Sequence, residues 1–238
     1  FNKFQINSQI KDKTGIDSVG VIPHFSNIKI NYPIKLDFLK NNVIIESLKK
    51  IILKFDNLKI NNNTFIITSP LSSDGKTFIT ILLALTAKEI GKKVLLIDMD
   101  SEKKTLTKKF FDKNFEHRGF TDLKLENYST SNIDNYILND KNCGLDIIPA
   151  GISSNDILKE NESFKLLIDH LSNKYDIIFC DTMPITYHPD SILISKYANS
   201  ILTIKHNSTP ISIVKHVIDE YQKLGIQAPN IIFNNIDF

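Results

Sequence analysis

Gly75, Lys76 and Thr77 stand between two runs of very different character. The run before them, "NTFIIT" (63–68), is apolar and β-branched, whereas the run after them, "ITILLALTAKEIG" (79–91), is typical of a helix. A strand, a loop and then Gly-Lys-Thr at a helix start is an arrangement that binds polyphosphate, because backbone N–H groups and the helix dipole face the anion. In such a loop the lysine reaches the β- and γ-phosphates and the hydroxyl holds Mg²⁺.

The loop itself departs from the common pattern of phosphate loops. Pro70 stands where a small residue is usual, and Ser72 and Ser73 sit where glycines are frequent. Taken alone, the loop is as compatible with an ordinary strand-to-helix turn as with a nucleotide site. If it is a nucleotide site, the residues that we expect to contact the nucleotide are Ser72, Ser73, Asp74, Gly75, Lys76, Thr77 and Phe78.

Acidic residues end two further apolar runs. Asp98 and Asp100 close "VLLIDMD" (94–100), and Asp181 closes "YDIIFCD" (175–181). In a parallel sheet ligands sit at the carboxyl ends of strands, so these acids and the lysine loop are predicted to meet at one edge. Buried unpaired carboxylates are costly, and a Mg²⁺–phosphate complex offers them a partner. The alternative is that each aspartate only caps a helix or closes a turn.

The residue types suit phosphoryl transfer, which needs charge neutralisation, positioning and a group that orients the nucleophile. Lys76, Thr77 and Mg²⁺ meet the first need, and Asp181 is expected to fix the waters of the metal. Asp98 and Asp100 are the candidates to orient or deprotonate an attacking hydroxyl. We therefore predict Lys76, Asp98 and Asp100 as catalytic residues. The predicted metal site consists of Thr77, Asp98 and Asp181.

The elements that must position these residues form an alternating pattern. Near-continuously apolar strands separated by helices predict an α/β fold with a doubly wound, mainly parallel sheet and helices on both faces. Residues 1–35 are the least regular and are interpreted as a leading arm before a domain over 36–238. The expected strands are 64–68, 93–98, 145–149, 175–181, 200–205 and 230–234. The expected helices are 43–54, 78–90, 162–172, 189–198 and 210–224.

Composition excludes several classes of function. A formal net charge of +2 over 238 residues, with no lysine-rich block, argues against nucleic acid as a partner. Cys143 and Cys180 form no C-x-x-C pair and indicate buried thiols in a reducing compartment. The histidines show no metal-ligand spacing, and no apolar run is long enough to span a membrane. The first residue is Phe, so we interpret the chain as a fragment.

The motifs together resemble a known family. The string "FIITSPLSSDGKTFITILLALTAKEIGKKVLLIDMD", followed by "IIPAG", "YDIIFCDTMP" and "IIFNNID", is similar to the bacterial tyrosine kinases of polysaccharide export. The resemblance covers roughly residues 15–238, includes a leading "TGIDSVGVIPHF" segment, and is greatest for the cytoplasmic domain of membrane autokinases. Such kinases share a P-loop fold with ATPases of the MinD/ParA type.

The resemblance implies roles for individual residues. The family's first nucleotide motif maps to residues 75–77, its second to Asp98 and Asp100, and its third to Asp181, which would hold Mg²⁺ through water. By the same resemblance Asn234 would lie near the adenine, although an Asn that closes a strand is often only a turn residue. Of the second pair, Asp98 is the implied base. The implied ligands are ATP or ADP with Mg²⁺.

The resemblance also implies a biological setting. It indicates an ATP-dependent protein-tyrosine autokinase that regulates capsule or exopolysaccharide polymerisation and export. The implied partners are further copies of the chain, a membrane polysaccharide co-polymerase segment in cis or in trans, and a tyrosine phosphatase. The implied location is the cytoplasmic side of a bacterial inner membrane, with the arm at 1–35 leading to an upstream membrane segment.

Three departures from the family pattern support an alternative. "SEKKT" follows the second aspartate where the family has arginines, and Glu46 is followed by Lys49 and Ile52 in place of two arginines. The chain also ends at Phe238 without a terminal tyrosine cluster, either because the cluster was trimmed or because the native protein has none. Loss of arginine forks weakens the case for the family's ring octamer. The alternative is a nucleotide-dependent switch or pseudokinase scaffold of the MinD/ParA type that acts without phosphorylating tyrosine.

Overall fold

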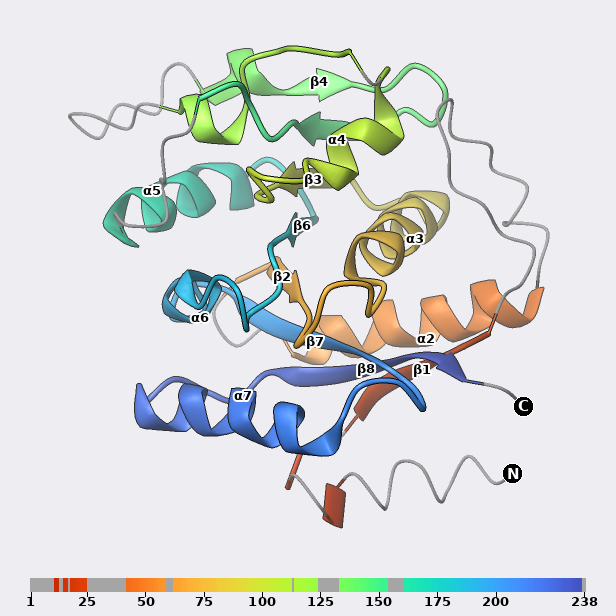
Figure 1. Ribbon diagram of the computed structural model, residues 1–238. Coiled ribbons are helices and arrows are strands. Elements are labelled where there is room, and N and C mark those ends of the chain that lie inside the picture. Colours follow the sequence, from red (N-terminus) through yellow and green to blue (C-terminus); the bar gives the residue numbers. More distant parts are fainter. Residues whose placement is uncertain are drawn as a thin grey trace.

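The computed structural model describes residues 11–12, 15–16, 18–24, 42–58, 62–112, 114–123, 133–153 and 161–236 (Figure 1). Its strands are β1 (Ser18–Pro23), β2 (Thr64–Thr68), β3 (Val94–Asp98), β4 (Leu138–Asn139), β5 (Asp146–Ile148), β6 (Ile177–Asp181), β7 (Asn199–Lys205) and β8 (Asn230–Ile236). Its helices are α2 (Asn42–Asn57), α3 (Lys76–Glu89), α4 (Thr105–Phe110), α5 (Asn161–Ser172), α6 (Asp190–Ile194) and α7 (Ile211–Lys223).

The strands form one 8-stranded sheet in the order β1-β8-β7-β2-β6-β3-β5-β4. The described pairings are parallel except that of β4 with β5. Figure 1 shows α2 and α3 on one face of the sheet and α5, α6 and α7 on the other. The predicted doubly wound α/β fold is therefore confirmed.

The central strands are apolar at every position because both of their faces are buried. In β2, Phe65 stacks on Phe55 of α2, with ring centroids 4.3 Å apart. The next residue, Ile66, belongs to the core cluster on the other face, together with Phe164 of α5. Each central strand is thus held between two layers of helices, and the loops at its carboxyl end start from fixed positions.

The expected leading arm requires a correction. Ser18–Pro23 is a strand of the sheet and pairs in parallel with β8, so the sheet extends into the region assigned to the arm. Gly20 explains how α2 covers this strand, because a Cβ there would lie 2.2 Å from the side chain of Ile51. Gly20 and Pro23 also weaken the strand pattern in the sequence. Most of the rest of 1–35 lies outside the described residues.

Other elements differ in smaller ways from the expectation. The six expected strands and five expected helices are present, but the helix expected at 189–198 covers only Asp190–Ile194. The short helix α4 and the two-residue strand β4 were not predicted. Both are shorter than the window in which hydrophobic periodicity can be recognised. In the described part of the chain, no helix combines the length and apolarity that crossing a membrane requires.

Candidate nucleotide site

The predicted acids and the lysine loop meet at one edge of the sheet. Asp98 and Asp181 are register partners at the carboxyl ends of β3 and β6. The Thr77 hydroxyl donates a hydrogen bond of 2.7 Å to Oδ2 of Asp181, a residue 104 positions away in the sequence. The Lys76 ammonium lies 3.6 Å from Oδ2 of Asp100. The convergence predicted from the sequence is therefore present in the structure.

The phosphate loop, residues 69–75, depends on a glycine with a positive φ. Gly75 has φ 90° and stands directly before the first turn of α3. A Cβ at this position would lie 2.2 Å from Nδ2 of Asn234, which donates to the Asp74 carbonyl oxygen at 3.2 Å. Ser73, where a glycine is frequent, has φ 75°. Asn234 thus lies against the loop and holds its backbone, whereas its expected place near the adenine stays a prediction.

The Asp74 side chain holds the phosphate loop through hydrogen bonds. Its Oδ2 accepts a hydrogen bond from the Leu71 N–H at 3.0 Å, and its Oδ1 accepts one from the Thr209 hydroxyl at 2.8 Å. The side chain is buried, and this burial raises the pKa of the carboxyl although the two hydrogen bonds oppose the change. Both carboxylate oxygens serve protein groups. Phe78 likewise contacts the protein, since it packs against the core cluster that includes the buried side chains of α2 and α3.

Two buried carboxylates side by side have raised pKa values. The pKa of Asp98 rises to about 7, first because of its burial and second because of the charge of Asp181. The pKa of Asp181 rises to about 6 because of its burial, although the charge of Lys76 and the Thr77 hydroxyl lower it. Without a cation, the negatively charged forms of these two side chains are therefore energetically unfavourable near neutral pH.

The buried oxygen atoms fit a magnesium ion. Asp181 Oδ1 and Asp100 Oδ2 are buried, and neither takes part in a hydrogen bond among the described residues. The Thr77 hydroxyl lies next to this pair, and Mg²⁺ prefers such hard oxygen ligands. The described residues contain no cluster of three or more His, Cys, Asp or Glu side chains that could hold a metal alone. Such an ion would need phosphate oxygens and water as further ligands, as Mg²⁺ usually has.

Asp98 has a different environment from Asp100. Its Oδ2 accepts hydrogen bonds from the Thr107 N–H and hydroxyl at 2.8 and 2.7 Å, and its Oδ1 accepts one from the Asp100 N–H at 3.1 Å. The Thr107 hydroxyl also accepts from the Ala150 N–H at 2.9 Å. Asp98 therefore orients Asp100 and the start of α4. Of the two predicted catalytic acids, Asp100 is the one beside Lys76.

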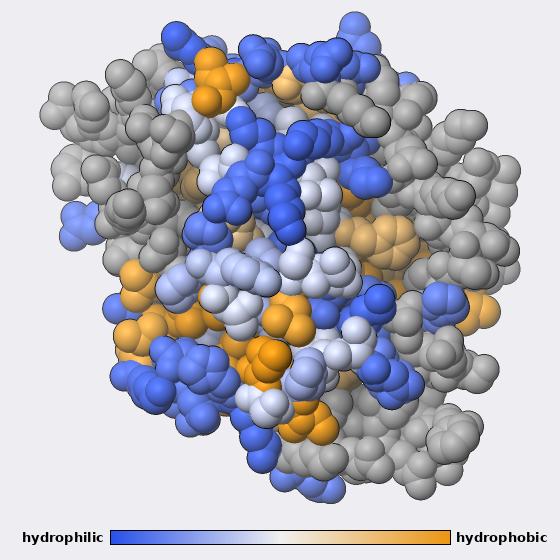
Figure 2. Space-filling view, viewed as in Figure 1, coloured by the Kyte–Doolittle hydropathy of each residue, from blue (hydrophilic) through white to orange (hydrophobic). Residues whose placement is uncertain are grey.

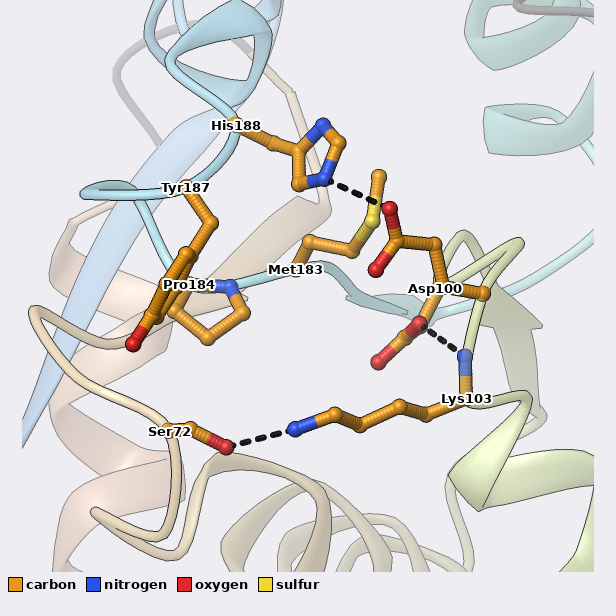
Figure 3. Close-up of a pocket in the computed structure, with 8 residues that line it drawn as sticks. Ser72, Asp100, Lys103, Met183, Pro184, Tyr187 and His188 are labelled. Carbon is orange, nitrogen blue, oxygen red and sulfur yellow. Dashed lines mark hydrogen bonds and ion pairs between the residues drawn. The ribbon is translucent and has the colours of Figure 1, made fainter.

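A cavity of about 250 Å³ opens beside the phosphate loop (Figure 3). Lys103 crosses one side and donates from Nζ to Oγ of Ser72 at 2.7 Å. On the other side, His188 Nε2 lies 3.1 Å from Oε1 of Glu102. In Figure 2, hydrophilic residues gather over α4 and the loop before it, close to this region. The cavity is lined by Ser72, Asp100, Glu102, Lys103, Met183, Pro184, Tyr187 and His188.

Most residues of the cavity wall were not predicted from the sequence. Lys103 and Glu102 were noticed only as replacements for arginines, and the β6–α6 loop that carries Tyr187 and His188 was not assigned to the site. No motif marks these positions, because they meet the phosphate loop through contacts between loops. The run "TYHP" right after an acid at a strand end is the signal that was available.

Comparisons with known proteins agree with this geometry. Residues 73–223 match the family model described as an AAA domain. In an alignment 253 positions long that covers 97% of this chain, the sequence is 27% identical to the tyrosine-protein kinase ptk of Acinetobacter johnsonii, of which it spans only 34%. The chain thus spans about a third of the length of this curated relative.

Solved structures show the same fold. The kinase domain of the Escherichia coli tyrosine kinase ETK superposes with a TM-score of 0.79, covering 96% of this chain and 93% of that one at 19% identity. A plasmid partition protein from Borrelia burgdorferi superposes with a TM-score of 0.56 at 26% identity, covering 73% and 78% of the two chains. The first likeness extends over more of the chain than the second.

Proposed function

Because the chain belongs to the AAA domain family, whose fold implies nucleotide binding, we propose that it is an ATP-dependent tyrosine kinase domain. One observation carries this proposal: Lys76, Thr77, Asp100 and Asp181 meet at the carboxyl edge of the sheet. The curated relative that aligns over 97% of this chain is itself named a tyrosine-protein kinase. The reaction would move the γ-phosphoryl group of ATP to a tyrosine hydroxyl.

Each residue has a role that follows from its position. The N–H groups of the phosphate loop and the Lys76 ammonium bind the β- and γ-phosphates and neutralise their charge. Thr77 and Asp181 would hold Mg²⁺, which would supply further neutralisation of the phosphates. Asp100, buried and 3.6 Å from Lys76, takes the proton of the attacking hydroxyl. Asp98 keeps Asp100 in place through its backbone N–H.

We propose a regulator of capsule or exopolysaccharide polymerisation and export, with this domain on the cytoplasmic side of a bacterial inner membrane. Its partners would be further copies of the chain, a polysaccharide co-polymerase segment in the membrane and a tyrosine phosphatase. These statements rest on the resemblance of the motifs and on the names of the relatives.

The direct test is phosphotyrosine formation with ATP and Mg²⁺. The chain should label itself or a synthetic Glu-Tyr copolymer, and Lys76→Met should abolish the labelling in both. Lys92→Met is the matched control, because Lys92 pairs with Asp56 near the end of α3, away from the phosphate loop. A wild-type chain that binds ATP and labels neither acceptor would refute the kinase assignment.

One feature of α2 favours the alternative of a nucleotide-dependent switch. Lys49 pairs with Glu46 on the same helix at 3.4 Å, and Ile52 is fully buried in the core. This helix therefore cannot present the arginine forks of the family pattern at positions 49 and 52. The switch predicts nucleotide-dependent association with slow hydrolysis and no phosphoprotein. Sedimentation with ADP and with an ATP analogue, together with the labelling assay, separates the two functions.

A further inference from the structure

The outward face of α2 carries the two most exposed aliphatic side chains of the described residues. Val43 is 67% exposed and Leu53 is 60% exposed, and both belong to this one helix. The opposite face of α2 is buried in the core cluster that it shares with β1 and α3. Two exposed apolar residues alone are ordinary on a protein surface, so their spacing and their neighbours decide what they mean.

The spacing is that of a coiled-coil seam. Exposed residues of α2 follow one another at alternating intervals of three and four positions, which is the spacing of the a and d positions of a heptad. Residues with this spacing lie in one stripe along a helix, the stripe by which one helix packs along another. The outer stripe of α2 consists of Val43, Glu46, Lys50, Leu53 and Asn57.

The order of side chains along the outer stripe is complementary to its own reverse. When two copies of α2 run antiparallel about an axis level with residue 48, Val43 faces Leu53 of the second copy and Glu46 faces Lys50 of the second copy. Each of these contacts occurs twice, because both are centred on the same axis. A parallel pair would instead place Glu46 against Glu46 and Lys50 against Lys50, which is repulsive. The charges therefore select the antiparallel arrangement.

The charged groups of the stripe are available for such a contact. Lys50 is exposed and forms no ion pair with any residue that the structure describes. Glu46 meets Lys49 of the same helix at 3.4 Å through one carboxylate oxygen, and both side chains are well exposed, so solvent screens this pair. A lysine from a second copy can thus bind Glu46 without breaking a strong contact.

We propose that the outer stripe of α2 pairs antiparallel with the same stripe of a second copy, which gives a dimer with two-fold symmetry. Such a contact joins one patch to itself and therefore ends at two copies, whereas a ring needs two different patches on each chain. No residue of the stripe lines the cavity beside the phosphate loop. The inference therefore names the surface and the symmetry of a contact between copies, and it does not depend on the kinase assignment.

The size of the contact limits its strength. A pair of helices of 16 residues buries less surface than the roughly 800 Å² per partner that stable complexes bury. At each end of the pair, one valine and one leucine leave water, and two pairs of opposite charges lie between these ends. We therefore expect a weak dimer with a Kd of about 0.1 mM, which forms only at high protein concentration.

Sedimentation equilibrium of the chain at up to about 0.5 mM measures this association. Glu46→Lys should weaken the dimer about tenfold, and so should Lys50→Glu, because each change turns two attractive pairs into two repulsive ones. The double variant Glu46→Lys/Lys50→Glu should restore the affinity to within about twofold. Lys165→Glu, a charge reversal on the exposed face of α5, is the matched control and should change nothing. A monomeric wild type, or a double variant as weak as the single ones, would overturn the inference.

Paired cysteines test the symmetry of the contact. Cys143 and Cys180 are buried, so cysteines introduced on the stripe would be the reactive thiols. Under mild oxidation a mixture of Val43→Cys and Leu53→Cys chains should form a disulfide-linked dimer. Each variant alone should form about tenfold less, because the two copies of either position lie at opposite ends of the contact. A chain with both changes should stop at a dimer with two disulfides, and ladders of longer products would refute the two-fold symmetry.

The same samples separate this inference from the proposed function. Lys76→Met lacks the phosphate-binding lysine and should still dimerise as the wild type does, because the stripe lies outside the phosphate loop. A wild-type chain that dimerises but labels no tyrosine refutes the kinase function alone. A chain that labels tyrosine but stays monomeric refutes this inference alone.

Discussion

The buried Asp181 carboxylate should destabilise the metal-free domain. The change Asp181→Asn should therefore raise the stability of the domain. The side chain is fully buried, one oxygen accepts the Thr77 hydroxyl, and the other accepts no hydrogen bond among the described residues. Burial raises the pKa from 3.8 to about 6. A difference of about two pKa units corresponds to about 3 kcal/mol between the two protonation states. The asparagine is nearly isosteric and keeps an oxygen for Thr77, so it should escape this penalty.

The sign of the pH dependence follows from the order of the two pKa values. The Asp181 carboxyl of the unfolded chain loses its proton first as the pH rises, so the contribution of Asp181 to wild-type stability falls from about pH 4 to about pH 6 and then stays level. Above that range the variant should be more stable by about 3 kcal/mol, or roughly 6 to 12 °C in Tm. Below it the two proteins should converge.

The assay is thermal and urea unfolding in a chelator at several pH values. Asp169→Asn is the matched control, because Asp169 is exposed on α5 and its ion pair with Lys165 at 2.9 Å is screened by solvent and contributes little to stability. With Mg²⁺ and ADP the wild type should gain more stability than Asp181→Asn. A variant that is less stable than the wild type at about pH 8 without metal would refute the reasoning, because Asp181 would then be well paired.

Three further predictions follow from single contacts. Gly75→Ala should lower the free energy of unfolding by about 2 kcal/mol or more, because alanine is strained at φ 90° and its Cβ would meet the Asn234 side chain. Thermal unfolding should show that adding Asn234→Ala restores only part of this loss. Lys103→Met should weaken binding of an ATP analogue about tenfold in calorimetry and leave ADP binding unchanged, because the Lys103 ammonium bonds the Ser72 hydroxyl of the phosphate loop at 2.7 Å and a γ-phosphate would be a stronger partner. Equal losses would contradict this expected contact with the γ-phosphate. Asp122→Ala should cost roughly 1–3 kcal/mol in urea unfolding, because this carboxylate accepts bonds from the Gly119, Ile152 and Ser153 N–H groups and the Ser153 hydroxyl; an unchanged midpoint would show that these bonds add nothing.

The site residues that could be predicted from the sequence are those that directly follow a strand or begin a helix. Asp98, Asp100 and Asp181 follow apolar strands, and in a parallel sheet the carboxyl ends of strands share an edge. Lys76 and Thr77 could be assigned because a Gly-Lys-Thr run at a helix start has a local physical meaning. Asn234 was reached only through the family resemblance, since nothing in its local sequence points to a loop 160 positions away.

The rest depends on contacts between loops and on glycine-mediated packing. The strand β1 was not predicted because Gly20 has no side chain that would fit a strand pattern. The reason for this glycine is seen only in the structure, where the Ile51 side chain lies over it. Asp98 accepts a hydrogen bond from the Thr107 hydroxyl, whereas Asp100 lies beside Lys76. The spacing of the two aspartates in the sequence could not distinguish these roles. Tyr187 joins the site through the bonds of its neighbours to the phosphate loop.

Titration of ADP into the chain, with and without Mg²⁺, is the most direct test of the site. If Lys76, Thr77 and Asp181 form one magnesium–nucleotide site, one ADP should bind per chain. Mg²⁺ should tighten this binding, and Thr77→Ala should remove most of the effect of the metal. The account would be contradicted if ADP and Mg²⁺ together gave no heat of binding. It would also be contradicted if the affinity for ADP changed neither with Mg²⁺ nor with Lys76→Met.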